Sequence, residues 1–160
     1  MIRIATILDI DKIIEIAAQS FKIHYKNIIS EEQIDYMYEK MYAPEVLLQQ
    51  MKEGHTFIIF FEDTNPLAFA SYFFREDNSL YLSKIYIKYD FRRHKIGTQL
   101  LAFIENIARK NNSPFVELNV NRKNNAVYFY KHIGFVLHEK TDIAYGKFWL
   151  NDYVLRKYIM

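Results

Sequence analysis

The chain has 160 residues, of which 51% are hydrophobic and 25% are charged, and its formal net charge is +2. A chain of this length and composition is expected to fold as one globular domain over residues 1–160, and a charge so close to balance gives no bias toward nucleic acid. The sequence contains no cysteine, which excludes disulfides, thiolate metal ligands and an acyl-enzyme formed on cysteine.

The N-terminal sequence argues against secretion and against a membrane protein. Arg3, Asp9 and Asp11 interrupt the first apolar run before a signal-peptide core could form, and no later stretch is long and uncharged enough to span a bilayer. We therefore expect a cytoplasmic protein without a membrane partner.

The first third of the chain is expected to form one short strand followed by helices. Residues 2–7 predict the strand, and Asp9 is a candidate N-cap for a helix whose apolar side chains recur at i, i+3, i+4 and i+7. Ser30, with a glutamine three residues later, is a capping-box pattern that predicts a second helix. Pro44 predicts the start of a further helix, which Gly54 ends.

The middle of the chain has the periodicity of strands. Residues 56–61 and 67–74 are β-branched and aromatic and flank a polar turn, which predicts a hairpin. In the next strand, residues 80–87, the two leucines have even numbers whereas the two isoleucines have odd numbers. One extra residue near Ser83–Lys84 would keep all four on one face, so we predict a β-bulge there.

The C-terminal part alternates helices and strands. The expected elements are an amphipathic helix over residues 97–110, a strand over 116–120, a short helix from Asn124 to a C-cap at Gly134, and a strand pair over 135–140 and 148–158. The sequence thus predicts an α+β fold in which helices pack on a mostly antiparallel sheet.

Two segments carry candidate chemistry. The first is a basic loop, Arg92 to Lys95, directly before the helix at Gly97. Backbone amides in the first turn of a helix lack intrahelical partners and carry the positive end of the helix dipole, so they bind phosphate readily, although a solvated basic loop explains the same residues equally well. The second is the short helix with Tyr130, whose phenol is able to donate a proton. Among 13 tyrosines, however, any single one is more often a packing residue.

Together these segments resemble the motifs of the GCN5-related N-acetyltransferase (GNAT) superfamily. The family's loop reads Arg/Gln-x-x-Gly-x-Gly/Ala after a bulged strand, and its later motif reads Asn…Ala-x-x-Phe-Tyr-x-x-x-Gly-Phe. The residues that match are Arg92, Gly97, Asn124, Ala126, Phe129, Tyr130, Gly134 and Phe135. The resemblance covers essentially the whole chain and implies the GNAT fold, with about four helices and a mixed, mostly antiparallel sheet of six to seven strands whose central strand is bulged and splayed.

The resemblance also implies an activity, the transfer of an acetyl group from acetyl-CoA to a primary amine by direct attack in a ternary complex. In the family the splayed strand pairs with the pantetheine arm, the loop holds the pyrophosphate, and the tyrosine of the second motif protonates the leaving thiolate. The implied cofactor-binding residues are Ile85, Tyr86, Ile87, Arg92, Arg93, His94, Lys95, Ile96, Gly97, Thr98, Asn124 and Tyr130, and the implied catalytic residue is Tyr130.

Two positions depart from the family pattern. Lys95 stands where the family has its first glycine, and its side chain should narrow the pyrophosphate cradle unless the backbone keeps a negative φ, although its ammonium group offsets this by binding phosphate. Ser83 stands where some relatives carry a carboxylate. No general base is therefore evident, and a water chain or a remote carboxylate must serve.

The amine acceptor is expected to bind at the first helices, as it does in the family. Carboxylates cluster there at Glu31, Glu32, Asp35 and Glu39, and their i, i+4 pairs repel each other unless a cation lies between them. A solvated helix face explains these residues as well. The sharper hypothesis is a polyamine such as spermidine or spermine, and residues 30–42 also look similar to part of the bacterial polyamine acetyltransferases.

Other functions remain open. One alternative is a non-catalytic acyl-CoA-binding module, and another is an acetyltransferase that acts on peptide N-termini or other small amines. We expect no nucleic-acid partner, because the basic cluster coincides with the phosphate loop and lacks a DNA-reading motif. We also expect no metal, because the five histidines show no metal-ligand spacing. A homodimer is compatible with the sequence.

Overall fold

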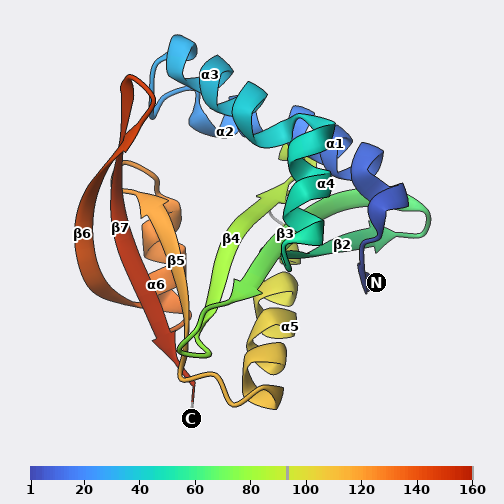
Figure 1. Cartoon of the computed structure of the whole chain (residues 1–160), viewed down its shortest axis with the longest axis vertical. Coiled ribbons are helices and arrows are strands. Elements are labelled where there is room, and N and C mark those ends of the chain that lie inside the picture. Colours follow the sequence, from blue (N-terminus) through green and yellow to red (C-terminus); the bar gives the residue numbers. More distant parts are fainter. Residues whose placement is uncertain (93, 160) are drawn as a thin grey trace. The chain divides into compact units, whose positions relative to one another are not determined.

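A computed structural model of the protein describes residues 1–92 and 94–159 (Figure 1). By its contacts the chain divides into two compact units. Unit 1 comprises Met1–Phe73 and Ser83–Ile104, and unit 2 comprises Phe74–Leu82 and Glu105–Met160. Two strands and one helix therefore contribute residues to both units: β3 (Asn65–Phe74), β4 (Leu80–Ile87) and α5 (Ile96–Lys110).

Unit 1 contains the N-terminal strand, the helical region and the hairpin. Beside its shares of β4 and α5, its elements are β1 (Ile2–Ile4), α1 (Ile10–Ala18), α2 (Phe21–Tyr25), α3 (Glu31–Tyr42), α4 (Pro44–Lys52), β2 (Thr56–Glu62) and β3 (Asn65–Phe74) up to Phe73. Two expected helix starts are confirmed, because Ser30 Oγ accepts a hydrogen bond from the Gln33 amide at 3.1 Å and Pro44 is the first residue of α4.

Unit 2 contains the C-terminal strands and one short helix. Its elements are β5 (Phe115–Asn121), α6 (Ala126–His132), β6 (Val136–Tyr145) and β7 (Phe148–Tyr158). The strand β6 extends past residue 140, its predicted end, because pairing with β7 continues to Tyr145 opposite Phe148. The described residues form six α-helices where about four were expected, since the apolar pattern of α1 runs on to Phe21 across a break after Ala18.

The hydrogen-bonded strands follow the order β1-β2-β3-β4-β5-β7-β6. In unit 1, β2 pairs antiparallel with both β1 and β3. In unit 2, the residues Leu80 to Leu82 of β4 pair parallel with β5, and β7 pairs antiparallel with β5 and β6. The expected α+β class and the mostly antiparallel sheet of seven strands are therefore confirmed.

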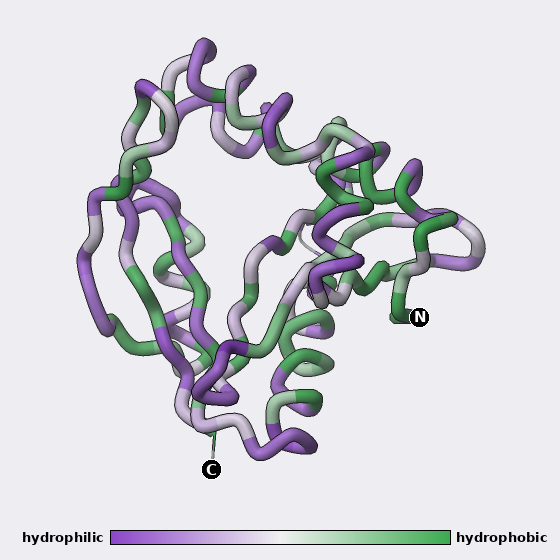
Figure 2. The backbone as a smooth tube through the Cα atoms, viewed as in Figure 1, coloured by the Kyte–Doolittle hydropathy of each residue, from purple (hydrophilic) through white to green (hydrophobic). Residues whose placement is uncertain are grey.

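The hairpin β2–β3 supplies much of the core of unit 1. Phe57, Ile59, Leu67 and Phe69 are at most 1% exposed, which is why this part of the chain is so rich in apolar residues. In Figure 2 the hairpin is green along most of its two strands and purple at its turn. The turn is tight, with Asp63 at a φ of 54°, a conformation that aspartate tolerates better than most residues.

In β4, buried side chains alternate with less buried ones as far as Lys84, which is further along the strand than we expected. Leu80, Leu82 and Lys84 are all buried and have even numbers, whereas Ser83 between them is exposed. The alternation is lost only after Lys84, since the next three side chains are all half-buried. A lysine thus continues the buried face of this strand, and a bulge near Ser83–Lys84 stays a prediction.

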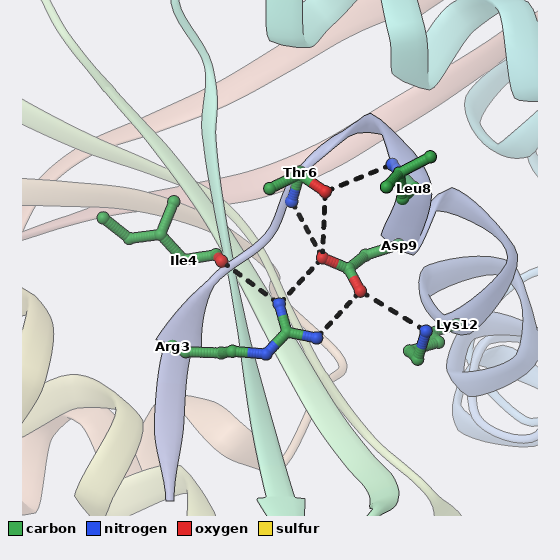
Figure 3. Close-up of polar contacts among 6 residues, drawn as sticks. All are labelled: Arg3, Ile4, Thr6, Leu8, Asp9 and Lys12. Atoms are coloured by element: carbon green, nitrogen blue, oxygen red, sulfur yellow. Dashed lines mark hydrogen bonds and ion pairs between the residues drawn. The ribbon is translucent and has the colours of Figure 1, made fainter.

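The junction between β1 and α1 is stabilised by a polar network around Asp9 (Figure 3). Asp9 occupies the N-cap position of α1, as predicted, but its side chain makes no capping hydrogen bond there. It instead completes a capping box with Thr6, the N-cap of the preceding 3₁₀ turn, Ile7–Asp9. The Thr6 side chain accepts from the Leu8 amide at 3.2 Å, and Asp9 accepts in return from the Thr6 amide at 2.8 Å. Arg3 donates to both oxygens of the buried Asp9 carboxylate at 2.8 and 2.9 Å, and Lys12 lies 3.4 Å from it.

Neutralising Asp9 is expected to destabilise the fold in a pH-dependent way. The hydrogen bonds from Arg3 hold the pKa of Asp9 far below its usual range. The stability that these hydrogen bonds give is therefore present above the pKa of Asp9 in the unfolded chain, near pH ~4. It is lost as the pH falls toward the lower pKa of Asp9 in the folded protein. We expect Asp9→Asn to lower the free energy of unfolding by about 1–3 kcal/mol at pH 7, and by less at pH 3.

Urea unfolding at the two pH values measures this difference. Asp11→Asn is the matched control, because Asp11 is an exposed acid in the first turn of the same helix. An equal loss for both variants, or a loss for Asp9→Asn that does not depend on pH, would contradict the role of the Asp9 network.

Candidate active site

The expected phosphate loop lies in unit 1, between β4 and α5. It contains a single 3₁₀ turn, Tyr89–Phe91, and α5 begins at Ile96, one residue earlier than predicted. The expected cofactor residues Arg92, His94 and Lys95 are exposed. The expected residue Arg93 lies outside the described residues. Thr98 and Gly97 are in the first turn of α5, whose amides lack intrahelical partners.

The backbone at Lys95 adopts a left-handed conformation, which glycine adopts more readily than lysine. Its φ is +60°, so the backbone does not have the negative φ that would keep the side chain from narrowing the pyrophosphate cradle. The other non-glycine residues with positive φ in the described part of the chain are Asp63, Asn78 and Asn112, residue types that tolerate this region better than lysine. The Lys95 carbonyl accepts from the Gln99 amide at 3.1 Å, so this strained residue stands at the N-cap position, directly before the first residue of α5.

Restoring a glycine at Lys95 is expected to stabilise the protein. A left-handed conformation costs an ordinary residue about 1 kcal/mol that glycine avoids, so we expect Lys95→Gly to raise the free energy of unfolding by up to ~1 kcal/mol. Gln99→Gly is the control in the same turn, where a helical φ makes glycine destabilising by about 1 kcal/mol. Urea unfolding of both variants measures the effects, and losses of equal size would show that Lys95 is unstrained.

Three contacts fasten the segment after β4 to α1 and the residues that follow it. Lys88 is buried, and its Nζ lies 2.9 Å from Glu15 Oε2. The Tyr89 amide donates to the Gln19 carbonyl at 3.2 Å, and Arg92 Nη2 lies 3.3 Å from Nδ1 of His24 in α2. Burial, and then the charge of Arg92, lower the pKa of His24 to about 4, so the imidazole is neutral at pH 7.

The side chain of Tyr86 belongs to an aromatic cluster rather than to the loop. Its ring centroid lies 5.7 Å from that of Phe21 and 5.8 Å from that of Phe69, and its hydroxyl lies 3.3 Å from the Tyr25 hydroxyl. Ile85 and Ile87, the other two strand residues expected to bind the cofactor, are half-buried. For all three residues the implied contact with pantetheine is made by the backbone, which leaves this packing intact.

The second motif lies in unit 2 and forms a compact local structure. The Asn124 side-chain oxygen accepts from the Ala126 amide at 2.8 Å, which helps to start α6. Tyr130 is buried, with its ring centroid 5.6 Å from that of Phe135. The Phe135 amide donates to the Tyr130 carbonyl at 3.0 Å, and Gly134 between them has a φ of +109°. The motif spacing therefore reflects a helix end that folds Phe135 back onto Tyr130.

The expected acceptor residues lie along the first turns of α3. Glu31 and Glu32 are exposed. Asp35 Oδ1 forms an ion pair with Lys22 Nζ at 3.1 Å, and the same ammonium lies 5.4 Å from the centroid of the Tyr38 ring. Both partners of the ion pair are about half exposed, so the pair contributes little to stability. Its arrangement nevertheless places a cation between a carboxylate and an aromatic face.

The sequence-predicted site residues are thus divided between the units. Within unit 1 the loop leads directly into the start of α5. Within unit 2 Asn124 lies at the start of α6, and Tyr130 lies in the last turn of the same helix. In the described part of the chain no three His, Asp or Glu side chains are grouped so that they could hold a metal ion. None of the helices that the structure describes is long and apolar enough to cross a bilayer.

Comparison with known proteins supports one family. Residues 25–151 match the family model described as an acetyltransferase (GNAT) domain. A spermidine N(1)-acetyltransferase of Thermoplasma acidophilum is 31% identical over 147 residues, which cover 88% of this chain and 90% of that protein.

Solved structures agree with this assignment. The PaiA N-acetyltransferase of Thermoplasma acidophilum, crystallised in complex with coenzyme A, has a TM-score of 0.84 and 29% identity, with 99% of this chain and 98% of that chain covered. A GCN5-related N-acetyltransferase from Rhodopseudomonas palustris has a TM-score of 0.85 at 18% identity, covering 99% of this chain and 94% of that one, a likeness of fold alone.

Proposed function

This chain belongs to the GNAT acetyltransferase family, and from that premise we propose that it transfers an acetyl group from acetyl-CoA to a primary amine. The observation that carries the proposal is the family match over residues 25–151, which includes both motifs. Coenzyme A in the similar PaiA structure supports the identity of the donor.

The residues of the loop fit a pyrophosphate. The left-handed turn at Lys95 leads directly into α5, whose first amides point out of the helix without intrahelical partners. Arg92 and Lys95 add positive charge beside these amides, and both are exposed. In the proposed complex these groups hold the phosphates of acetyl-CoA, and the backbone of Ile85–Ile87 binds the pantetheine arm.

The proposed reaction is a direct transfer. The amine nitrogen attacks the acetyl carbonyl carbon, the C–N bond forms, and the C–S bond to coenzyme A breaks. Tyr130 gives its phenolic proton to the departing sulfur, because a thiolate is a better leaving group when a donor neutralises it. The absence of cysteine removes the usual thiol acyl carrier and favours direct attack over an acyl-enzyme.

A polyamine is the proposed acceptor. Two observations support it, the 31% identity to a spermidine N(1)-acetyltransferase and the carboxylates of α3. The cation site of Asp35 and Tyr38, which Lys22 fills in the free protein, is also suited to a second ammonium group of a polyamine. One amine would react while another displaces Lys22 from Asp35.

Steady-state release of coenzyme A with spermidine, spermine, a simple monoamine and a peptide N-terminus tests the proposal. We expect Asp35→Asn and Glu32→Gln to raise the KM for spermidine several-fold, Lys22→Gln to lower it, and all three to leave the monoamine unaffected. Glu45→Gln, an exposed acid at the start of α4, is the control.

The outcomes separate the competing functions. Transfer to small monoamines or peptide N-termini without transfer to any polyamine would keep the acetyltransferase and reject the polyamine. Tight binding of coenzyme A without transfer to any amine would instead support the acyl-CoA-binding module.

A further inference from the structure

One side chain of unit 1 has chemistry that the proposed mechanism does not yet use. Lys84 is 8% exposed and lies one residue before Ile85, the first residue of the backbone proposed to bind pantetheine. Its Nζ donates to the side-chain oxygen of Gln50 in α4 at 2.9 Å. A buried lysine is normally paired with a carboxylate, yet no ion pair of Lys84 is found among the described residues.

Lys84 shares one face of the sheet with Tyr86. Its Nζ lies 5.5 Å from the centroid of the Phe57 ring, and the Phe57 ring stacks on that of Phe69 at 6.3 Å. Tyr86 packs on the same Phe69 ring at 5.8 Å and also contacts Phe21 of α2. Lys84 therefore lies on the face of unit 1 that contacts α2 and α4, two helices of the N-terminal region in which the amine is expected to bind.

Unit 1 also contains buried polar atoms that have no hydrogen-bond partner in the described residues. Two of these atoms, Ser71 Oγ and His55 Nδ1, bear on the surroundings of Lys84. Ser71 stands directly opposite Phe57 in the β2–β3 register, which places it on the same face as Lys84. His55 precedes β2 and is close enough for the Lys84 charge to lower its pKa, after the larger effect of burial. Buried polar atoms normally have partners, so this face is suited to a further polar group.

We propose that Lys84 is the proton acceptor for the amine that attacks acetyl-CoA, an inference that rests on the proposed acetyl transfer. As the C–N bond forms, the nitrogen passes one proton to the neutral Lys84 amine. The sulfur receives its proton from Tyr130, so each proton has a donor and an acceptor. Lys84 then returns its proton to solvent and Tyr130 regains one, which leaves an amide and a thiol as products.

The acid–base properties of the surrounding groups agree with this role. Burial lowers the pKa of Lys84 to about 8, so part of it is a neutral amine near pH 8. Among the described residues, His55 is a titratable group that interacts with the Lys84 charge. Burial lowers the pKa of His55 most, the Lys84 charge lowers it further, and the Glu53 charge raises it. Tyr72 of the neighbouring β3 stays protonated, because burial raises its pKa.

Other candidate bases are less suitable. His24, with a pKa of about 4, is too weak a base to hold a proton from an amine at neutral pH. Of the unit 1 carboxylates, Asp9 is bound by Arg3 and Glu15 pairs with Lys88. In unit 2, burial raises the pKa of Asp152, which makes it the carboxylate to compare with Lys84.

The pH dependence of kcat at saturating acetyl-CoA and amine tests the proposal. For the wild type, kcat should rise through a midpoint near pH ~8 as Lys84 loses its proton. Lys84→Met should lower kcat at pH 8 by roughly 10²–10³-fold and should abolish this rising limb of the pH profile. The KM for acetyl-CoA should stay unchanged. Lys84→Arg should lose as much, because arginine keeps the cation but has no removable proton near this pH.

Two variants separate catalysis from packing. Gln50→Glu places a carboxylate on the Lys84 ammonium and should move the midpoint to higher pH without removing the amine. Lys52→Met, an exposed lysine in the last turn of the same helix, should leave both kcat and the midpoint unchanged. As a readout independent of activity, NMR titration of ¹⁵N-labelled lysine should give Lys84 a midpoint near pH ~8.

Each other outcome overturns the inference. A Lys84→Arg enzyme with the wild-type profile would make Lys84 a structural cation, and an NMR midpoint at the ordinary value of lysine would remove the neutral amine. Loss of the limb in Asp152→Asn, but not in Lys84→Met, would assign the proton to Asp152. If the wild type binds coenzyme A but acetylates no amine, the proposed function fails first, and this inference fails with it.

Discussion

Replacing Tyr130 by phenylalanine is expected to lower kcat by roughly 10²–10⁴-fold while the KM for acetyl-CoA changes little. The substitution removes only the phenolic hydroxyl group, whose proton in the proposed reaction neutralises the departing thiolate. The ring remains, and with it the contacts to Phe129 at 5.5 Å and to Phe135 at 5.6 Å between centroids. The folded structure should therefore survive, and thermal unfolding should show a nearly unchanged midpoint.

The same helix provides the control for this experiment. Tyr128 lies two residues earlier in α6 and is 74% exposed, so Tyr128→Phe removes an equivalent hydroxyl where no chemistry is proposed. Single-turnover measurement of acetyl transfer keeps product release from hiding the effect. A Tyr130→Phe enzyme that transfers the acetyl group as fast as the Tyr128→Phe enzyme would make Tyr130 a packing residue.

Features of the fold that depend on neighbours in sequence could be predicted. Ser30 and Pro44 start helices through contacts within one turn, and Gly54 leaves α4 with a φ of +98°. Asp9 was predicted as the N-cap of the first helix and occupies that position, whereas its capping box with Thr6 was not predicted, although the two residues have the spacing of one. What the sequence could not reveal is why Asp9 is buried, because its partner Arg3 reaches it from the adjacent strand.

The candidate site likewise has a part that could be predicted from the sequence and a part that could not. The phosphate loop and the Tyr130 helix were recognisable because their residues lie close together in sequence and act through local backbone geometry. Lys84 and His24 were not recognised, since their properties depend on partners 34 and 68 residues away, Gln50 and Arg92. For Lys84 a weak signal existed: a lysine at an even position in a strand whose even positions are otherwise apolar.

Replacing Gly97 by glutamate is expected to weaken the binding of coenzyme A by roughly 10²–10³-fold. A carboxylate in the first turn of α5 would stand within a few ångströms of the pyrophosphate, where like charges repel by about 4 kcal/mol in partly solvated surroundings. An acidic side chain at a helix N-terminus is favourable in the free protein, because it meets the positive end of the helix dipole. The substitution should therefore weaken binding without lowering the stability of the fold.

Gly97→Gln separates the effect of charge from the effect of size, since glutamine has the shape of glutamate without its charge. Calorimetric titration with coenzyme A should give the glutamine variant an intermediate affinity, set by the bulk of the side chain close to the phosphates. The gap between the two variants should narrow in high salt, because dissolved ions screen the repulsion between exposed charges. Equal affinities for wild type, Gly97→Gln and Gly97→Glu, all folded, would place the pyrophosphate away from the start of α5.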